Sequence, residues 1–217
     1  SALTAWLASG APLADVVLRG MDLRDHAAEL TSRDLRGAVL LGCELEPPDL
    51  ARAVLAGALV FPTLTGLPYE PWRTTLYTPD ELFGGFDPSD PCTYCDTLDA
   101  RVYRHFRAMG GSGEAPMLEA FAQRLHDHGI TEALEDLLRE HARVVAFMGG
   151  HGMSRDDEVY LEVARMAGEL ARRGFVVATG GGPGAMEAAN LGARFAARDD
   201  AALASAVSPR WASTIAA

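Results

Sequence analysis

The fold is decided by two glycine-rich stretches, RVVAFMGGHGM at residues 143–153 and GFVVATGGGPGAMEAANLGARFAA at residues 174–197. Each contains a short apolar run, Val144 to Met148 in the first and Phe175 to Ala178 in the second. Apolar runs bounded by glycine are typical of strands in a parallel sheet that is covered on both faces. We therefore expect two parallel strands, each followed by a glycine loop.

The segment between these stretches predicts a helix. Ser154 is a suitable N-cap, acidic residues follow it in the first turn, and Gly174 supplies the stop. The expected apolar stripe consists of Val159, Val163, Met166 and Leu170. Strand, helix and strand make a βαβ unit with a right-handed crossover. The fold class that we expect is α/β, a Rossmann-like parallel sheet flanked by helices.

The exit of the second strand carries four glycines within five positions, Gly180, Gly181, Gly182 and Gly184, with Pro183 among them. Glycine permits a sharp backbone turn, and Pro183 suits the first position of the next helix. Unpaired N–H groups at a helix N-terminus bind anions, most often a nucleotide phosphate. The alternative is a tight strand-to-helix turn, but one glycine suffices for that. The glycine content therefore favours a phosphate site.

Two other phosphate-binding motifs fit less well. A Walker A loop ends in Gly-Lys-Ser/Thr, whereas Gly184 is followed by Ala185 and Met186. A dinucleotide fingerprint requires an acidic residue at the end of a further strand, about 20 residues on. Asp199 and Asp200 have that distance, but no strand is expected before them. An NAD-dependent oxidoreductase is therefore the weakest of the functions considered.

The motifs MGGHGM at 148–153 and GGGPGAMEAANLGA at 180–193 resemble the Lonely Guy family and its relatives, the nucleotide 5′-monophosphate nucleosidases. The resemblance implies a Rossmann-like sheet, a homo-oligomer, and cleavage of a nucleoside monophosphate into base and ribose 5-phosphate. The candidate substrate- and phosphate-binding residues are Gly149, Gly150, His151, Gly180, Gly181, Gly182, Gly184, Met186 and Glu187.

The family has a second signature, Pro-Gly-Gly/Ser-x-Gly-Thr-x-x-Glu, that supplies phosphate donors and the catalytic carboxylate. Nothing similar follows Ala197. We therefore expect the sequence to be an incomplete member, without appreciable nucleosidase activity of its own and with no identifiable catalytic residue. The leading function is that of a nucleoside monophosphate phosphoribohydrolase, with the activity expected of the full-length protein. The alternative is a non-catalytic nucleotide sensor or regulatory domain.

Two candidate residues have structural alternatives. His151 lies after the first predicted strand, where ligands of open α/β folds collect, but it could instead cap the adjoining helix. Glu187 could complement the helix dipole. A carboxylate would repel a bound phosphate, so an active Glu187 is expected to meet the ribose hydroxyls.

Composition restricts the function further. The formal net charge of −11 argues against nucleic acid and anionic membranes as partners. No run reaches the roughly 18 apolar residues of a membrane span, and no signal-peptide pattern opens the chain, so we expect a cytoplasmic protein. The 217 residues include no lysine, which excludes a pyridoxal-phosphate Schiff base. We expect no cofactor.

We expect residues 1–141 to form a smaller α/β region that precedes the nucleotide-binding region at 142–217. Residues 1–36 have mostly helical spacing, and 38–43, 47–56 and 58–61 predict strand, helix and strand. Residues 62–95 predict a long ordered loop or a lid, because their aromatic residues need burial. Helices are predicted at 99–109, 116–128 and from Thr131, as a cap, to His141.

The cysteines give a weak metal signal. Cys92-x-x-Cys95 has zinc spacing, with Cys43 and His105 as conceivable further ligands, but no second spaced pair is present. We expect free thiols and no metal. The histidines of the predicted helical surface are expected to be solvated; they are His126, His128 and His141.

Overall fold

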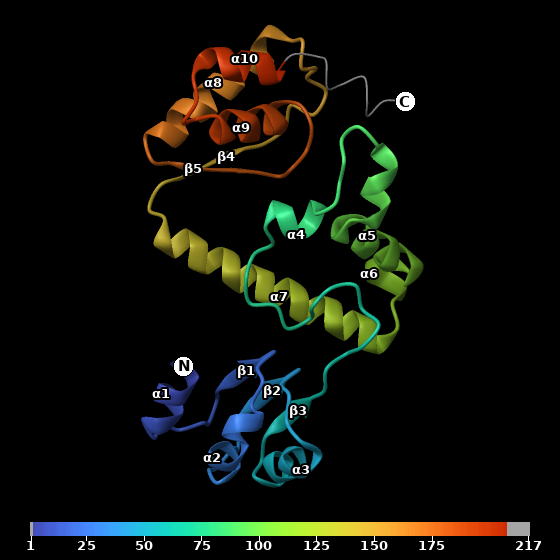
Figure 1. The fold of residues 1–217 in the computed structure, drawn as a ribbon, viewed down its shortest axis with the longest axis vertical. Coiled ribbons are helices and arrows are strands. Elements are labelled where there is room, and N and C mark those ends of the chain that lie inside the picture. The colour runs from blue at the N-terminus through green and yellow to red at the C-terminus, as the bar shows by residue number, and fades with distance from the viewer. Residues whose placement is uncertain (1, 208–217) are drawn as a thin grey trace. The chain divides into compact units, whose positions relative to one another are not determined.

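The computed structural model describes residues 2–207 (Figure 1). Its fold is α/β, as predicted, with a three-stranded and a two-stranded parallel sheet. Of the described residues, 2–86 and 93–134 form one compact unit, and 87–92 and 135–207 form the other. No helix in the described part is long and apolar enough to cross a membrane.

The three-stranded sheet has the order β1 (Val17–Arg19), β2 (Val39–Leu41), β3 (Leu59–Phe61). Val17 pairs with Val39, and Leu41 pairs with Phe61. Around it lie α1 (Ala2–Ala8), η1 (Arg24–His26), α2 (Ala27–Thr31) and α3 (Pro47–Leu55). Strands β2 and β3 and helix α3 confirm the predicted βαβ unit. The prediction of helix throughout residues 1–36 was wrong, because β1 adds a third strand.

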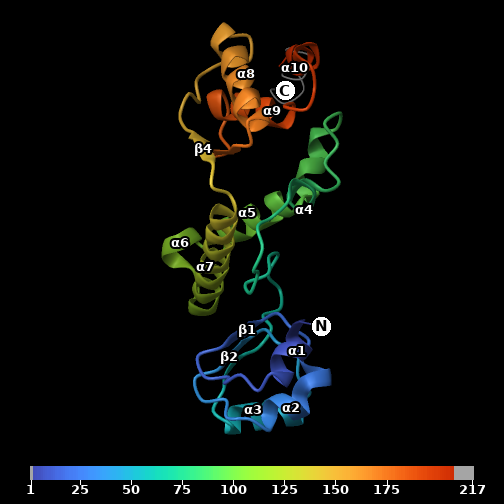
Figure 2. The ribbon, with the colours of Figure 1, turned by 90° about the vertical axis from the view of Figure 1, so that its left-hand side faces the viewer.

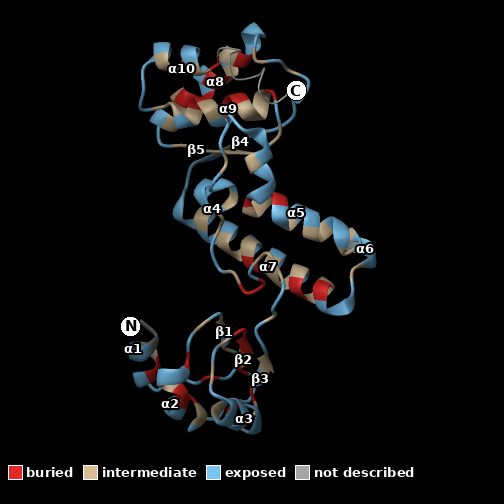
Figure 3. Ribbon diagram, turned by 45° about the vertical axis from the view of Figure 1, so that its right-hand side comes forward, coloured by how far each residue is buried: buried red, intermediate tan, exposed pale blue. Residues whose placement is uncertain are grey.

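Leucine fills the core of this sheet. The buried cluster consists of Leu7, Leu13, Leu23, Leu30, Leu35, Ala38, Leu40, Ala53 and Ala58. Leu23, Leu35 and Leu40 are almost completely inaccessible to solvent. These residues come from both helices and strands, so the cluster fixes the helices on the sheet (Figure 3).

The remainder of this unit is mainly helical. It contains α4 (Pro79–Phe83), η2 (Pro91–Asp96), α5 (Leu98–Ala108), α6 (Gly111–Glu114) and α7 (Met117–Glu140), of which η2 and α7 extend across the boundary between the units. The predicted loop 62–95 thus includes the short helices α4 and η2.

Helix α7 corrects the prediction of two helices separated near Thr131. The helix continues through Gly129, where a Cβ atom would lie only 2.2 Å from the Arg73 carbonyl oxygen, so this glycine is required for packing. Thr131 is no cap, since its hydroxyl donates to the Asp127 carbonyl oxygen one turn back, at 2.8 Å.

The second unit confirms the βαβ prediction for residues 143–197. Strand β4 (Val144–Phe147) pairs in parallel with β5 (Val176–Thr179), and the order is β4, α8 (Glu158–Arg172), β5, α9 (Ala185–Arg194), α10 (Asp200–Val207). The three helices lie on one side of the strand pair (Figures 1 and 2). Exposed and half-buried residues alternate along β4. Within this unit the expected cover on both faces is therefore absent from the described residues.

Helix α8 departs from prediction at two points. Its N-cap is Asp157, whose side chain accepts from Val159 N at 2.9 Å, whereas the Ser154 hydroxyl contacts the Asp156 carboxylate. Its predicted apolar stripe is partly exposed, with Val159 at 46% and Met166 at 53%. The buried face lies one residue further along the helix and consists of Tyr160, Ala164, Ala167 and Gly168.

The small residues of that face explain the shift. A Cβ atom on Gly192 of α9 would lie 1.8 Å from the Ala164 carbonyl oxygen, and one on Gly168 would lie 3.0 Å from the Gly192 carbonyl oxygen. Helices α8 and α9 therefore approach each other closely, backbone against backbone. Close packing of small residues outweighs burial of the larger Val159 and Met166 side chains.

Candidate functional site

The two predicted glycine loops lie next to each other at the carboxyl end of β4 and β5. Because these strands are parallel, both loops leave the same edge of the sheet. The N–H of Ala185, the first residue of α9, donates to the Gly150 carbonyl oxygen at 3.3 Å. The structure thus brings together segments that are more than 30 residues apart in the sequence.

Two of the glycines are required by this contact. Gly184 has φ +74°, and a Cβ atom on it would lie 2.0 Å from the Gly150 carbonyl oxygen. A Cβ atom on Gly150, with φ +67°, would lie 2.6 Å from Ala185 Cβ. Both positions therefore exclude a side chain by backbone conformation and by space.

Other glycines of the loops border open space. No atom lies within 4 Å of a Cβ position on Gly149 or Gly181. At Gly182 the nearest atom is the terminal methyl of Met186, which can move. The sequence alone did not indicate which glycines are needed for close packing and which border open space.

The start of α9 offers unpaired donors. The N–H groups of Gly182, Gly184 and Met186 donate to no other group in the described part of the chain. The N–H of Gly181, in contrast, donates to Thr179 Oγ1 at 3.1 Å, and the same oxygen accepts from Asn190 Nδ2 at 2.9 Å. Pro183 was predicted at the first helical position, but α9 begins two residues later, after the N-cap Gly184. Unpaired amides at a helix N-terminus are suitable for binding an anion.

Glu187 is paired with a residue that the sequence analysis missed. Arg155 Nε donates to Glu187 Oε1 at 2.9 Å, and both side chains are partly buried. This hydrogen bond is the main reason why the pKa of Arg155 is raised. No local spacing indicates a pair 32 residues apart. The adjacency of the two loops was the available signal, because Arg155 follows the first loop and Glu187 follows the second.

Tyr160 lies close to this pair and was also missed. Its ring is fully buried in the cluster between α8 and α9, and its hydroxyl has no hydrogen-bond partner in residues 2–207. Burial, and next the nearby negative charge of Glu187, raise the pKa of Tyr160 to about 12. Tyr160 is therefore a neutral phenol at neutral pH.

His151 is exposed and directly follows Gly150 in the first glycine loop. The alternative that it caps the adjoining helix is excluded, because Asp157 caps α8. Asp199 and Asp200 are exposed, as expected, and they open α10. Asp199 Oδ1 accepts from Ala202 N at 2.7 Å, and Asp200 pairs with Arg165 at 3.0 Å. They do not end a strand, so they do not occupy the place of a dinucleotide-binding acid.

The predicted cysteine and histidine environments are correct in part. Cys92 and Cys95 are exposed, whereas the Cys43 thiol is half-buried, 3.4 Å from the Leu18 carbonyl oxygen. No group of three or more histidine, cysteine or acidic side chains in the described residues could hold a metal ion. His128 and His141 are exposed, as predicted. The prediction for His126 was wrong, because its Nε2 lies 3.0 Å from the Tyr77 hydroxyl and its ring is half-buried.

No family model, curated protein or solved structure matches this chain. The resemblance to the Lonely Guy family therefore rests on the two quoted motifs alone.

Proposed function

We propose that the two glycine loops bind the phosphate of a nucleoside monophosphate, and that the protein acts as a phosphoribohydrolase on that class of nucleotide. The contact between Gly150 and the start of α9 carries this proposal. This contact holds the backbone turn before α9 in place. The N–H groups of Gly182, Gly184 and Met186 in that turn remain unpaired, at the positive end of the helix. Open space beside Gly149 and Gly181 gives a phosphate room to approach.

The Arg155–Glu187 pair removes an objection to this site. An isolated carboxylate at the start of α9 would repel a phosphate. Here the positive guanidinium offsets its charge. Arg155 has five N–H donors and uses Nε and one Nη on Glu187, so further donors remain for phosphate or ribose oxygens. Glu187 then acts as the group that positions Arg155.

The proposed chemistry is departure of the base from an oxocarbenium-like sugar, which requires a carboxylate near the anomeric carbon. Glu187 is engaged by Arg155, which favours the second candidate function, a sensor that binds the nucleotide without cleaving it. Release of ribose 5-phosphate from AMP, GMP, CMP and UMP by the purified chain tests the hydrolase. Because these 217 residues contain no second signature, binding without release is the expected result. Turnover would refute the sensor.

Phosphate recognition is tested by thermal unfolding. A nucleoside monophosphate should raise the melting temperature, and the parent nucleoside should raise it much less. A ligand at 100 times its Kd stabilises by about 2.7 kcal/mol. Gly182→Val should abolish the increase without unfolding the chain, because its φ is not positive and the obstructing Met186 methyl can move.

Gly113→Val is the matched control, since no atom lies within 4 Å of its Cβ position and it is outside the loops. It should keep the nucleotide-dependent increase. Equal increases with nucleoside and nucleotide would refute phosphate recognition.

A further inference from the structure

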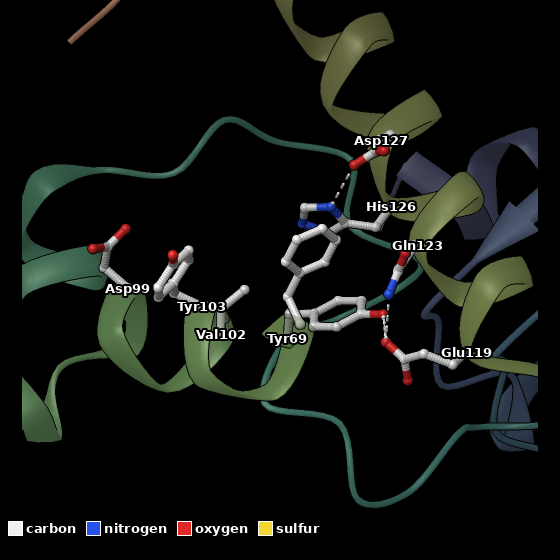
Figure 4. Close-up of a pocket in the computed structure, with 9 residues that line it drawn as sticks. Tyr69, Asp99, Val102, Tyr103, Glu119, Gln123, His126 and Asp127 are labelled. Carbon is white, nitrogen blue, oxygen red and sulfur yellow. Dashed lines mark hydrogen bonds and ion pairs between the residues drawn. The ribbon is translucent and has the colours of Figure 1, made fainter. Parts of the chain in front are cut away.

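A second candidate site lies in the other compact unit and shares no residue with the glycine loops. It is a pocket of about 320 Å³ between α5, α7 and the loop that carries Tyr69 (Figure 4). Small-molecule sites typically begin near this size and combine apolar walls with a few polar groups. The apolar part of the wall is formed by Tyr69, Val102, Tyr103 and Phe106.

Glu119 is the buried polar group of this pocket, with a relative exposure of only 8%. Its Oε1 accepts from the Tyr69 hydroxyl at 2.9 Å and from Gln123 Nε2 at 3.1 Å, and its Oε2 lies 3.0 Å from His105 Nε2. Burial by itself would raise the pKa of Glu119, but the hydrogen bonds from His105, Gln123 and Tyr69 together lower it. The carboxylate is therefore an anion at neutral pH.

This network leaves one acceptor position unused. Each carboxylate oxygen can accept two hydrogen bonds. Oε1 has two partners and Oε2 has one. A ligand that donates one hydrogen bond can therefore complete the shell of Glu119 without displacing a protein group.

Apart from histidine, the ionisable residues with a charge at neutral pH that line the pocket are all acidic. Asp99 on α5, together with Glu119 and Asp127 on α7, lines it, and no arginine does among the described residues. Figure 4 shows Asp99 and Tyr103 across the pocket from the side chains of α7. Tyr103 is 62% exposed, so its ring is accessible at the mouth. Carboxylates and aromatic faces both attract cations, and in a partly desolvated pocket their effects add.

We propose that this pocket binds a small organic cation, an amine attached to a flat or apolar body. The body contacts Tyr69, Val102 and Phe106, and the ammonium group donates to the open position on Glu119. Asp99 and Asp127, on other sides of the pocket, add to the negative potential that attracts it (Figure 4). A purely structural network would hold the Tyr69 loop on α5 and α7 equally well. It would show no preference for positively charged ligands.

The test compares three probes of one shape, namely benzylamine, benzyl alcohol and benzoate, by isothermal titration calorimetry at pH 7. Benzylamine is a cation there, the alcohol is neutral and benzoate is an anion. We expect benzylamine to bind in the millimolar range and the other two at least tenfold more weakly. Glu119→Gln should weaken benzylamine binding about tenfold or more. Asp99→Asn and Asp127→Asn should each weaken it several-fold.

The control is Asp25→Asn, which makes the same charge change at an exposed position outside the pocket and should leave binding unchanged. Should Glu119→Gln disturb folding, as circular dichroism would reveal, the two aspartate variants still decide the outcome. Equal binding of the three probes, no binding of benzylamine, or binding that every pocket variant retains would each overturn the proposal.

Discussion

Parallel strands followed by glycine occur in both units, yet the two sheets use these glycines differently. Gly20 and Gly42 follow β1 and β2, and Gly149 and Gly181 follow β4 and β5 within two residues. All four have positive φ. A Cβ atom on Gly42 would lie 2.0 Å from the Trp72 ring, and one on Gly20 would lie 3.1 Å from Glu70 Oε1. No atom lies within 4 Å of the corresponding position on Gly149 or Gly181.

This difference separates a glycine that packs from a glycine that leaves space. At the first sheet the protein's own Trp72, which is buried, occupies the strand edge. At the second sheet the same edge is open beside unpaired backbone amides. A glycine after a parallel strand therefore predicts space at the carboxyl edge of the sheet. The rest of the fold determines whether a side chain of the protein fills that space or whether it stays open to a ligand.

The largest expected effect is on stability. Gly42→Ala combines an unfavourable φ of +60° with a clash against Trp72 and should cost about 3 kcal/mol of unfolding free energy. Gly181→Ala has a similar φ of +72° but no clash, so it should cost about 1 kcal/mol. Urea denaturation followed by circular dichroism measures both. Equal losses would show that the Trp72 contact makes no difference between the two edges.

A smaller effect is expected at the open edge. Arg155→Ala leaves Glu187 unpaired beside the proposed phosphate site and should weaken nucleoside monophosphate binding about tenfold, roughly 1.4 kcal/mol. Arg165→Ala, which removes an exposed pair with Asp200, is the control and should leave the Kd unchanged. Calorimetric titration with AMP and GMP provides the measurement. Tighter binding by the Arg155 variant would contradict this role.

The smallest effect concerns access to the filled edge. Burial raises the pKa of the Cys43 thiol, which directly follows Gly42, whereas Cys92 and Cys95 are exposed. Because the thiolate is the reactive species, iodoacetamide at pH 8 should modify Cys43 several-fold more slowly than the other two. Peptide mass spectrometry over time measures the rates. Trp72→Ala should bring the rate of Cys43 modification closer to the rates of Cys92 and Cys95. Phe83→Ala, which removes an exposed aromatic side chain, should leave the three rates unchanged. Cys43 reacting as fast as Cys92 would mean that this edge is open as well.

Strand β1 was missed although the sequence contains a signal for it. Val17-Leu18-x-Gly20-x-Asp22 is repeated, with Glu for Asp, as Val39-Leu40-x-Gly42-x-Glu44. The spacing of 22 residues is the register in which Val17 pairs with Val39. Helical spacing of apolar residues nearby obscured a strand of only three residues. Comparison of the segment with itself would have revealed it.

The sequence by itself determined the βαβ unit at 143–197, because continuous apolar runs and terminal glycines depend only on neighbouring residues. It also located the glycine loops. The tertiary structure alone decided which face of α8 is buried, since alanine and glycine contribute little hydrophobicity but allow the backbone of α9 to approach. It decided equally that Arg155 meets Glu187 and that Tyr69 meets Glu119, 50 residues away. Such contacts join segments whose proximity exists only in the folded chain, so no local pattern of residues encodes them.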